Sequence, residues 1–216
     1  QQKPQPLVLS GTSASWPLAK AVYLFTDPQD NLKPADIFQK YRAGNGKPFA
    51  QPEINLGYNS PPVWLVFSLY NTSTTQLHWV LNLGDKFNGL TGTADTITLY
   101  DAELYLPVMT DGRLAKNKRQ LEGQEKNALP LILKPGLVKT FALKIDPTAG
   151  IAFNFKPVVM EEETFKSAFA KISMATSALA ASVIIIGLIL FFFSPERLRG
   201  LAGFLLIYAA FHFTGF

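Results

Sequence analysis

The feature that most constrains this chain is a long apolar run near its C-terminal end. Residues 172–193 contain no Asp, Glu, Lys or Arg and include the string VIIIGLILFFF. As a helix with a rise of ~1.5 Å per residue, this run would extend ~33 Å, enough for a hydrocarbon core ~30 Å thick. It also lacks the polar face of a helix on the surface of a globular domain. We therefore predict a transmembrane helix over residues 172–193, with a buried core helix as the alternative.

The residues that follow predict a second crossing. Residues 194–200 read SPERLRG, a helix-breaking turn with two arginines, and residues 201–216 are apolar again. Arginines in a short loop indicate the cytoplasmic side, although lysines before the first run nearly balance the count. The expected export of the N-terminal region decides the orientation of the first helix, so we place Arg197 and Arg199 in the cytoplasm. The second run is short and ends without a closing charge, which predicts a chain cut within this helix.

One ionisable side chain falls inside the second run. His212 would lie about 12 residues past the arginine loop, or ~18 Å deep, near the middle of the membrane. An ionisable residue at that depth is a candidate functional residue. The alternative is a neutral imidazole that is hydrogen-bonded to another helix, and both interpretations stay open.

The region before residue 172 has the composition of an ordinary soluble protein, and its length suits one domain. The chain has no cysteine and starts at Gln1 without methionine, which favours a mature bacterial periplasmic domain whose signal peptide has been removed. The formal net charge of +4 is small and scattered, so it indicates no nucleic-acid partner. The expected location is therefore the bacterial inner membrane, with the N-terminal domain in the periplasm.

Apolar and polar residues alternate in five segments of this region, which predicts half-buried strands. The expected inward side chains are Val63, Leu65, Phe67, Leu69, Leu77, Trp79, Leu81, Leu83, Ile97, Leu99, Leu104, Leu106, Phe141, Leu143, Ile145, Ile151, Phe153 and Phe155. Many short strands separated by turn residues are typical of an antiparallel sandwich or barrel. The exception is NLKPADIFQKY, where Pro34 suits a first helical turn and Ile37 and Phe38 can pack on the sheet.

We find no catalytic signature and predict no catalytic residue, cofactor or metal site. The two histidines, His78 and His212, fall on different sides of the expected membrane boundary. The carboxylates considered for glycoside hydrolysis are Asp85, Asp95, Asp101 and Glu103, and solvated loop residues are the simpler interpretation. Those considered for calcium are Asp27, Asp30 and Asp36, which a turn and a helix cap explain equally well.

Binding is easier to argue than catalysis. Trp64, Ser68 and Tyr70 share one face of a predicted strand, and His78 and Asn82 share the corresponding face of the next predicted strand. If those strands pair, the five side chains form a polar and aromatic patch that suits a small molecule or carbohydrate. The alternative is that Trp64 is a core residue between two sheets. The other candidate partners are membrane lipid and a second copy of the chain.

The order of these segments resembles a known family. The strings are AVYLFTDPQDNLKPADIF, LNLGYNSPPVWLVFSLYNTS, HWVLNLG, ITLYDAELYLP and LILKPGLVKTFALKI, followed by EEETFKSAF and the two apolar runs. Together they are similar to the extracellular sensor domain and first two helices of bacterial seven-transmembrane receptors with diverse intracellular signalling modules. The W-L-x-F-x-L-x-N string, residues 64–71, and the hairpin Pro135–Gly136 carry most of the likeness.

The resemblance implies a jelly-roll sandwich similar to carbohydrate-binding modules, followed by transmembrane helices and an output such as a histidine kinase or diguanylate cyclase. The expected parts of the chain are an N-terminal extension and first strand (1–20), the sandwich (21–160), a juxtamembrane linker (161–171), the first transmembrane helix (172–193), a cytoplasmic loop (194–200) and a truncated second helix (201–216). The predicted function is periplasmic ligand sensing, without catalysis in this part of the chain. The alternative is a membrane-anchored sandwich that binds or assembles other proteins.

Overall fold

The computed structural model describes residues 5–10, 15–49, 51, 53–58, 60–75, 78–83, 94–111, 114, 128–149, 152–193 and 203. The chain divides into two compact units, Gln1–Phe165 and Lys166–Phe216. The first unit holds every strand of the described residues, and the second is represented by most of one helix.

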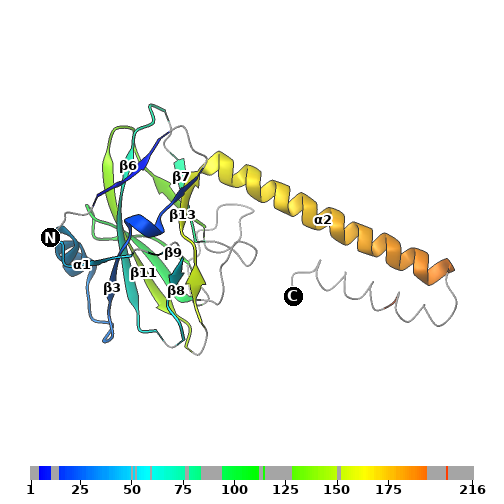
Figure 1. Cartoon of the computed structure of the whole chain (residues 1–216), viewed down its shortest axis with the longest axis horizontal. Helices are drawn as coiled ribbons and strands as arrows, with labels where there is room; N and C mark the ends of the chain where they lie inside the picture. Colours follow the sequence, from blue (N-terminus) through cyan, green and yellow to red (C-terminus); the bar gives the residue numbers. More distant parts are fainter. Residues whose placement is uncertain are drawn as a thin grey trace. The chain divides into compact units, whose positions relative to one another are not determined.

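The larger sheet of the first unit has the order β4-β3-β6-β11-β8-β9, with β1 paired to β6 as a parallel addition. Its strands are β1 (Leu7–Leu9), β3 (Tyr23–Thr26), β4 (Lys47–Pro48), β6 (Val63–Asn71), β8 (Ala94–Asp101), β9 (Pro107–Asp111) and β11 (Val138–Pro147). All its other pairings are antiparallel, and β6 and β11 run side by side through its centre (Figure 1). On the edge that faces away from β11, strand β6 pairs with both β3 and β1.

A smaller antiparallel sheet has the order β10-β7-β13-β2. Its strands are β2 (Ser15–Pro17), β7 (His78–Asn82), β10 (Ala128–Ile132) and β13 (Val158–Glu161). A short third pair joins β5 (Ile54–Asn55) to β12 (Asn154–Phe155), and a 3₁₀ turn, η1 (Ala19–Ala21), follows β2. The prediction of a mainly β, antiparallel fold is confirmed.

The inner faces of the larger and the smaller sheet share one hydrophobic core. Val63, Leu65, Phe67 and Leu69 enter it from β6, and Trp79 and Leu81 enter it from β7, as their alternation predicts. Phe141, Leu143 and Ile145 of β11 complete this face, and the rings of Phe67 and Phe141 lie 5.9 Å apart. Two expected members, Leu104 and Leu106, are instead 64% and 61% exposed, because they lie in the connection between β8 and β9 and not on a strand. Leu77 and Ile151 lie outside the described residues.

Helix α1 (Pro34–Arg42) covers the outer face of the larger sheet, beside β3 in Figure 1. Its buried side chains Ile37, Phe38 and Tyr41 pack in a second cluster with Trp64 and Val66 of β6. The helix begins with Pro34, and the Asp36 carboxylate accepts a hydrogen bond from the Lys33 amide at 3.1 Å. The predicted helix and its packing are therefore confirmed. This cover also makes β6 buried on both faces, unlike a strand of a simple sandwich.

Helix α2 (Glu162–Phe193) begins directly after β13, with no connecting residue. It includes the run 172–193 and most of the segment 161–171 that was expected to be a linker. In the part of the chain that the structure describes, no helix meets the length and apolarity needed to cross a membrane. The predicted loop 194–200, with Arg197 and Arg199, and His212 in the second predicted helix all lie outside the described residues.

Candidate functional site

The five side chains expected to form one binding patch lie on two different sheets. Trp64, Ser68 and Tyr70 belong to β6 of the larger sheet, whereas His78 and Asn82 belong to β7 of the smaller sheet. The condition for a single patch, that these two strands pair, is not met, because β6 pairs with β11, β3 and β1, and β7 pairs with β10 and β13. The two groups point away from the shared core on opposite sides. They therefore do not combine into one surface.

Trp64 is buried, with 1% of its surface exposed, but it lies under α1 and not between the sheets. Its indole Nε1 donates a hydrogen bond to the Asp27 carboxylate at 3.3 Å. The Tyr100 ring lies 5.3 Å from the indole, and the Lys144 Nζ lies 5.8 Å from its centroid. These contacts make Trp64 a support for the connection between β3 and α1.

That connection is held by carboxylates. The buried Asp27 also accepts hydrogen bonds from the amides of Asn31 and Leu32, each at 3.1 Å. Asp30 forms an ion pair of 2.5 Å with Lys144. Burial lowers the pKa of Lys144, but its hydrogen bond to Asp30 and the charge of Asp146 outweigh this and raise the pKa above its ordinary value. The interpretation of these acidic residues as a turn and a helix cap therefore accounts for their contacts.

Ser68 lies in a chain of hydroxyl groups beneath α1. Its Oγ is 3.0 Å from the Tyr41 hydroxyl and 2.8 Å from the Thr140 hydroxyl. Burial raises the pKa of Tyr41, although the hydrogen bond to Ser68 opposes this rise. The Tyr41 ring meets the Tyr23 ring edge to face, with centroids 5.3 Å apart. Tyr70, two residues further along β6, is half-buried between the exposed Val8 and Val138.

His78 and Asn82 lie at the two ends of β7. The His78 Nδ1 is 3.8 Å from the Glu162 carboxylate, in the first turn of α2. Between them on the same face, Val80 packs with Phe165 of that turn. The start of α2 is therefore attached to the smaller sheet both through β13 and through side chains.

The other acidic residues considered from the sequence have separate partners. Asp95 accepts a hydrogen bond from the Thr148 hydroxyl at 2.7 Å, and the buried Asp101 pairs with Lys139 at 2.7 Å. Asp101 also accepts a hydrogen bond from the Glu103 amide at 2.8 Å. Asp85 lies outside the described residues. Within the described ranges, no three His, Cys, Asp or Glu residues are placed to hold a metal ion.

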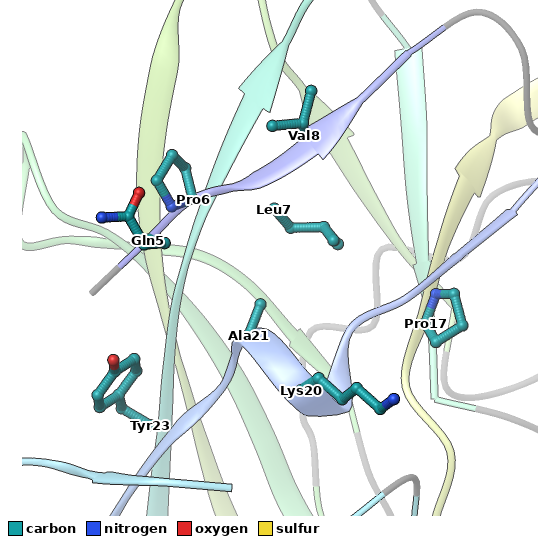
Figure 2. A pocket seen from close by; sticks show the side chains of 8 residues that line it. All are labelled: Gln5, Pro6, Leu7, Val8, Pro17, Lys20, Ala21 and Tyr23. Atoms are coloured by element: carbon teal, nitrogen blue, oxygen red, sulfur yellow. The ribbon is translucent and has the colours of Figure 1, made fainter. Parts of the chain in front are cut away.

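A pocket of about 310 Å³ lies at the edge of the two sheets (Figure 2). It is lined by Gln5, Pro6, Leu7, Val8, Pro17, Lys20, Ala21 and Tyr23. The lining residues come from β1 and the two residues before it, from β2 and η1, and from the first residue of β3, so the pocket bridges both sheets. This site is not recognisable in the sequence, because its residues belong to no motif and meet only through the pairing of β1 with β6. Short-range patterns in the sequence do not reveal this pairing.

Several solved structures are similar to this chain at low scores. A β-glucosidase from Kluyveromyces marxianus in complex with glucose is 11% identical over 74% of this chain, with a TM-score of 0.32, and only 17% of its own length is covered. A family 35 carbohydrate-binding module from an environmental isolate is 15% identical over 64% of this chain and 82% of its own, with a TM-score of 0.28. The K3 adhesin domain of Lys-gingipain from Porphyromonas gingivalis is 14% identical over 68% and 94%, with a TM-score of 0.30. Likenesses this distant do not indicate what the chain binds.

No protein of curated function matches the chain. A family model does match, over residues 19–157, which is well over half of the chain. The matched range includes α1, β6, β7 and the hairpin before β11, the segments that carry the resemblance seen in the sequence. The model describes extracellular sensor domains and not enzymes. The chain therefore belongs to the family described as 7TMR-DISM extracellular 2, the extracellular domains of seven-transmembrane receptors with diverse intracellular signalling modules.

Proposed function

We propose that the unit Gln1–Phe165 is the periplasmic ligand-sensing domain of a receptor in the bacterial inner membrane, and that its ligand is a small molecule or carbohydrate. The observation that supports this best is the direct passage from β13 into α2. A shift in the sheet reaches the helix most directly where no loop intervenes, and here no residue lies between the end of β13 and the start of α2. The strands of the domain would be connected as in a jelly roll, and the domain would lie in the periplasm.

The start of α2 suits the transfer of a signal. Phe165 is 8% exposed and packs with Val80 of β7 and Ala128 of β10, while β13 itself is hydrogen-bonded to β7 and β2. A small shift of this sheet would therefore move the first turn of the helix. A ligand acts in this way only if it binds one arrangement of the sheet better than the other.

The rest of α2 supports membrane anchoring. Residues 172–193 carry no formal charge. The exposed apolar side chains of the helix are Met174, Leu179, Ile185, Ile186, Leu188, Ile189 and Phe192. Lipid would cover these side chains, and the cytoplasmic output enzyme of such a receptor would follow later in the full-length chain.

A panel of neutral and acidic saccharides tests the ligand class. The full chain, purified in detergent, should bind at least one saccharide at millimolar concentration or better in isothermal titration calorimetry. The control is the same titration with Lys40→Ala, which should bind equally well, because Lys40 is exposed on α1 and lies outside the pocket. Absence of binding to every saccharide would contradict the carbohydrate part of the proposal.

The alternative function, a membrane-anchored protein-interaction subunit, is favoured by one surface. Val8, Tyr70 and Val138 form a row across three strands, and Val8 and Val138 are 48% and 53% exposed. The partner at this surface would be a second copy of the chain. Light scattering of the chain in detergent should then give a dimer that Val138→Lys converts to a monomer, whereas a monomer at the start would contradict this alternative.

A further inference from the structure

We propose that the pocket between β1 and η1 binds a small acidic saccharide, such as a uronic acid, with its carboxylate at Lys20. This inference rests on the proposed function, because it names the class of ligand that the sensor takes. The pocket volume of about 310 Å³ lies at the lower end of the ~300–1,000 Å³ range of small-molecule sites, which suits one or two sugar rings.

The charge of the pocket favours an anion. Lys20 is the only formally charged residue among the eight that line it. Within the described residues, no carboxylate forms an ion pair with Lys20. A ligand carboxylate would give this ammonium group a partner and a charge-assisted hydrogen bond.

The other polar groups favour a hydroxylated ligand. In the described part of the chain, neither the Gln5 amide nor the Tyr23 hydroxyl has a hydrogen-bond partner. Gln5 and Tyr23 lie on one side of the space in Figure 2, and Lys20 and Pro17 lie on the other. A sugar acid has this same division, since its ring hydroxyls and its carboxylate lie on different carbons. The Gln5 amide can both donate to and accept from hydroxyl groups.

The apolar lining suits the C–H faces of a sugar ring. It comes from Pro6, Leu7, Val8, Pro17 and Ala21, together with the Tyr23 ring. Tyr23 is held in place by its edge-to-face contact with Tyr41, so little side-chain entropy would be lost on binding. An aromatic ring fixed in this way is a good surface for a sugar face.

The pocket is also connected to the strand that enters α2. The turn that carries Lys20 is tied to the residue before β13, because the Leu18 amide donates a hydrogen bond of 2.9 Å to the Pro157 carbonyl. Pro17, which lines the pocket, lies opposite Val158 of β13. A ligand that draws η1 toward β1 would therefore act on β13 at its first residues. The pocket thus lies where a ligand can bias the start of the helix.

Calorimetric titration of the full chain in detergent with sodium D-glucuronate and with D-glucose tests this inference. We expect glucuronate to bind about two- to fivefold more tightly than glucose, because Lys20 is exposed and its ion pair with the carboxylate would be screened by water. Lys20→Ala should remove this difference by weakening glucuronate binding about two- to fivefold, and it should leave glucose binding unchanged. The matched control is Lys40→Ala, at an exposed position of α1 outside the pocket, which should bind as the unaltered chain does. Thermal unfolding of both variants should match the unaltered chain and so confirm that they fold.

Four outcomes would overturn the inference. Equal binding of glucose and glucuronate, or equal effects of Lys20→Ala and Lys40→Ala, would show that the ligand is not held by this ammonium group, while a carbohydrate sensor would still stand. Binding that is unaffected by Tyr23→Leu would place the ligand elsewhere. Failure of every saccharide to bind would remove the carbohydrate ligand altogether. The location of the domain would then still be decided by labelling a cysteine placed in α1.

Discussion

The amide of Gly136 donates a hydrogen bond of 2.7 Å to the carbonyl of Asn71, which joins the end of β6 to the hairpin before β11. These residues belong to the two strings that carry most of the family likeness, W-L-x-F-x-L-x-N and P-G. The Asn71 amide returns a second hydrogen bond, of 3.2 Å, to the Leu137 carbonyl. The two strings therefore describe one structural feature, the closure of the central strand pair.

Asn71→Ala should destabilise the domain by ~2 kcal/mol, because buried groups would lose their partners. The Asn71 side chain is fully buried, donates to the Leu133 carbonyl at 2.8 Å and accepts from the Ser73 amide at 3.0 Å. Chemical denaturation of the full chain measures the change. Asn45→Ala, at an exposed position, is the control and should change the free energy of unfolding by less than ~0.5 kcal/mol.

Gly136→Ala should cost ~1–2 kcal/mol, because a residue with a Cβ is strained in the left-handed region. The φ of Gly136 is 73°, and an added Cβ would meet no atom within 4 Å, so the cost comes from the backbone alone. Gly136→Asn should recover part of the loss, since Asn tolerates this conformation better. Equal unfolding free energies for glycine and alanine at this position would contradict the account.

Asp27→Ala should destabilise the domain by ~2–4 kcal/mol, because a buried network of hydrogen bonds would be broken. It would leave the Trp64 indole and the amides of Asn31 and Leu32 without their acceptor. Hydrogen exchange should become faster at those two amides, and circular dichroism should retain the β signal. Asp36→Ala removes only the exposed cap of α1 and should cost ~1 kcal/mol or less.

Stability should decrease as the pH rises above about 10, partly through Tyr41. Burial raises the pKa of Tyr41 above its ordinary value of 10.0, so the unfolded chain loses this proton at a lower pH than the folded chain. The folded state then binds more protons, and the free energy of unfolding falls with pH until the folded pKa is passed. Tyr41→Phe should make this fall less steep, as measured by urea denaturation between pH 9 and pH 11 (approximate limits set by the ordinary tyrosine pKa). An unchanged slope would show that Tyr41 does not contribute.

Local patterns in the sequence predicted what depends on near neighbours. The alternation of β6 gave the correct inner face from Val63 to Leu69, because successive strand residues point to opposite sides. Pro34 and the apolar pair Ile37 and Phe38 predicted α1 and its packing. Both results follow from geometry that spans only a few residues.

The candidate site could not be predicted in the same way. Whether β6 pairs with β7 is a question of topology, and period-two patterns do not distinguish a neighbour in the same sheet from a strand across the core. The burial of Trp64 depends on α1, whose residues lie 22 to 30 positions earlier in the chain (64 − 42 and 64 − 34). Short-range periodicity does not reach over such a span. The pocket around Lys20 and Tyr23 exists only because β1 returns as a parallel strand beside β6.

The most direct test of the central claim is the side of the membrane on which the domain lies. The chain has no cysteine, so Lys40→Cys in α1 and Arg199→Cys in the predicted cytoplasmic loop each provide one labelling site. In cells with a permeabilised outer membrane and an intact inner membrane, a membrane-impermeant maleimide should label the first variant and spare the second until the inner membrane is opened. Labelling of Lys40→Cys only after the inner membrane is opened would contradict a periplasmic sensor domain.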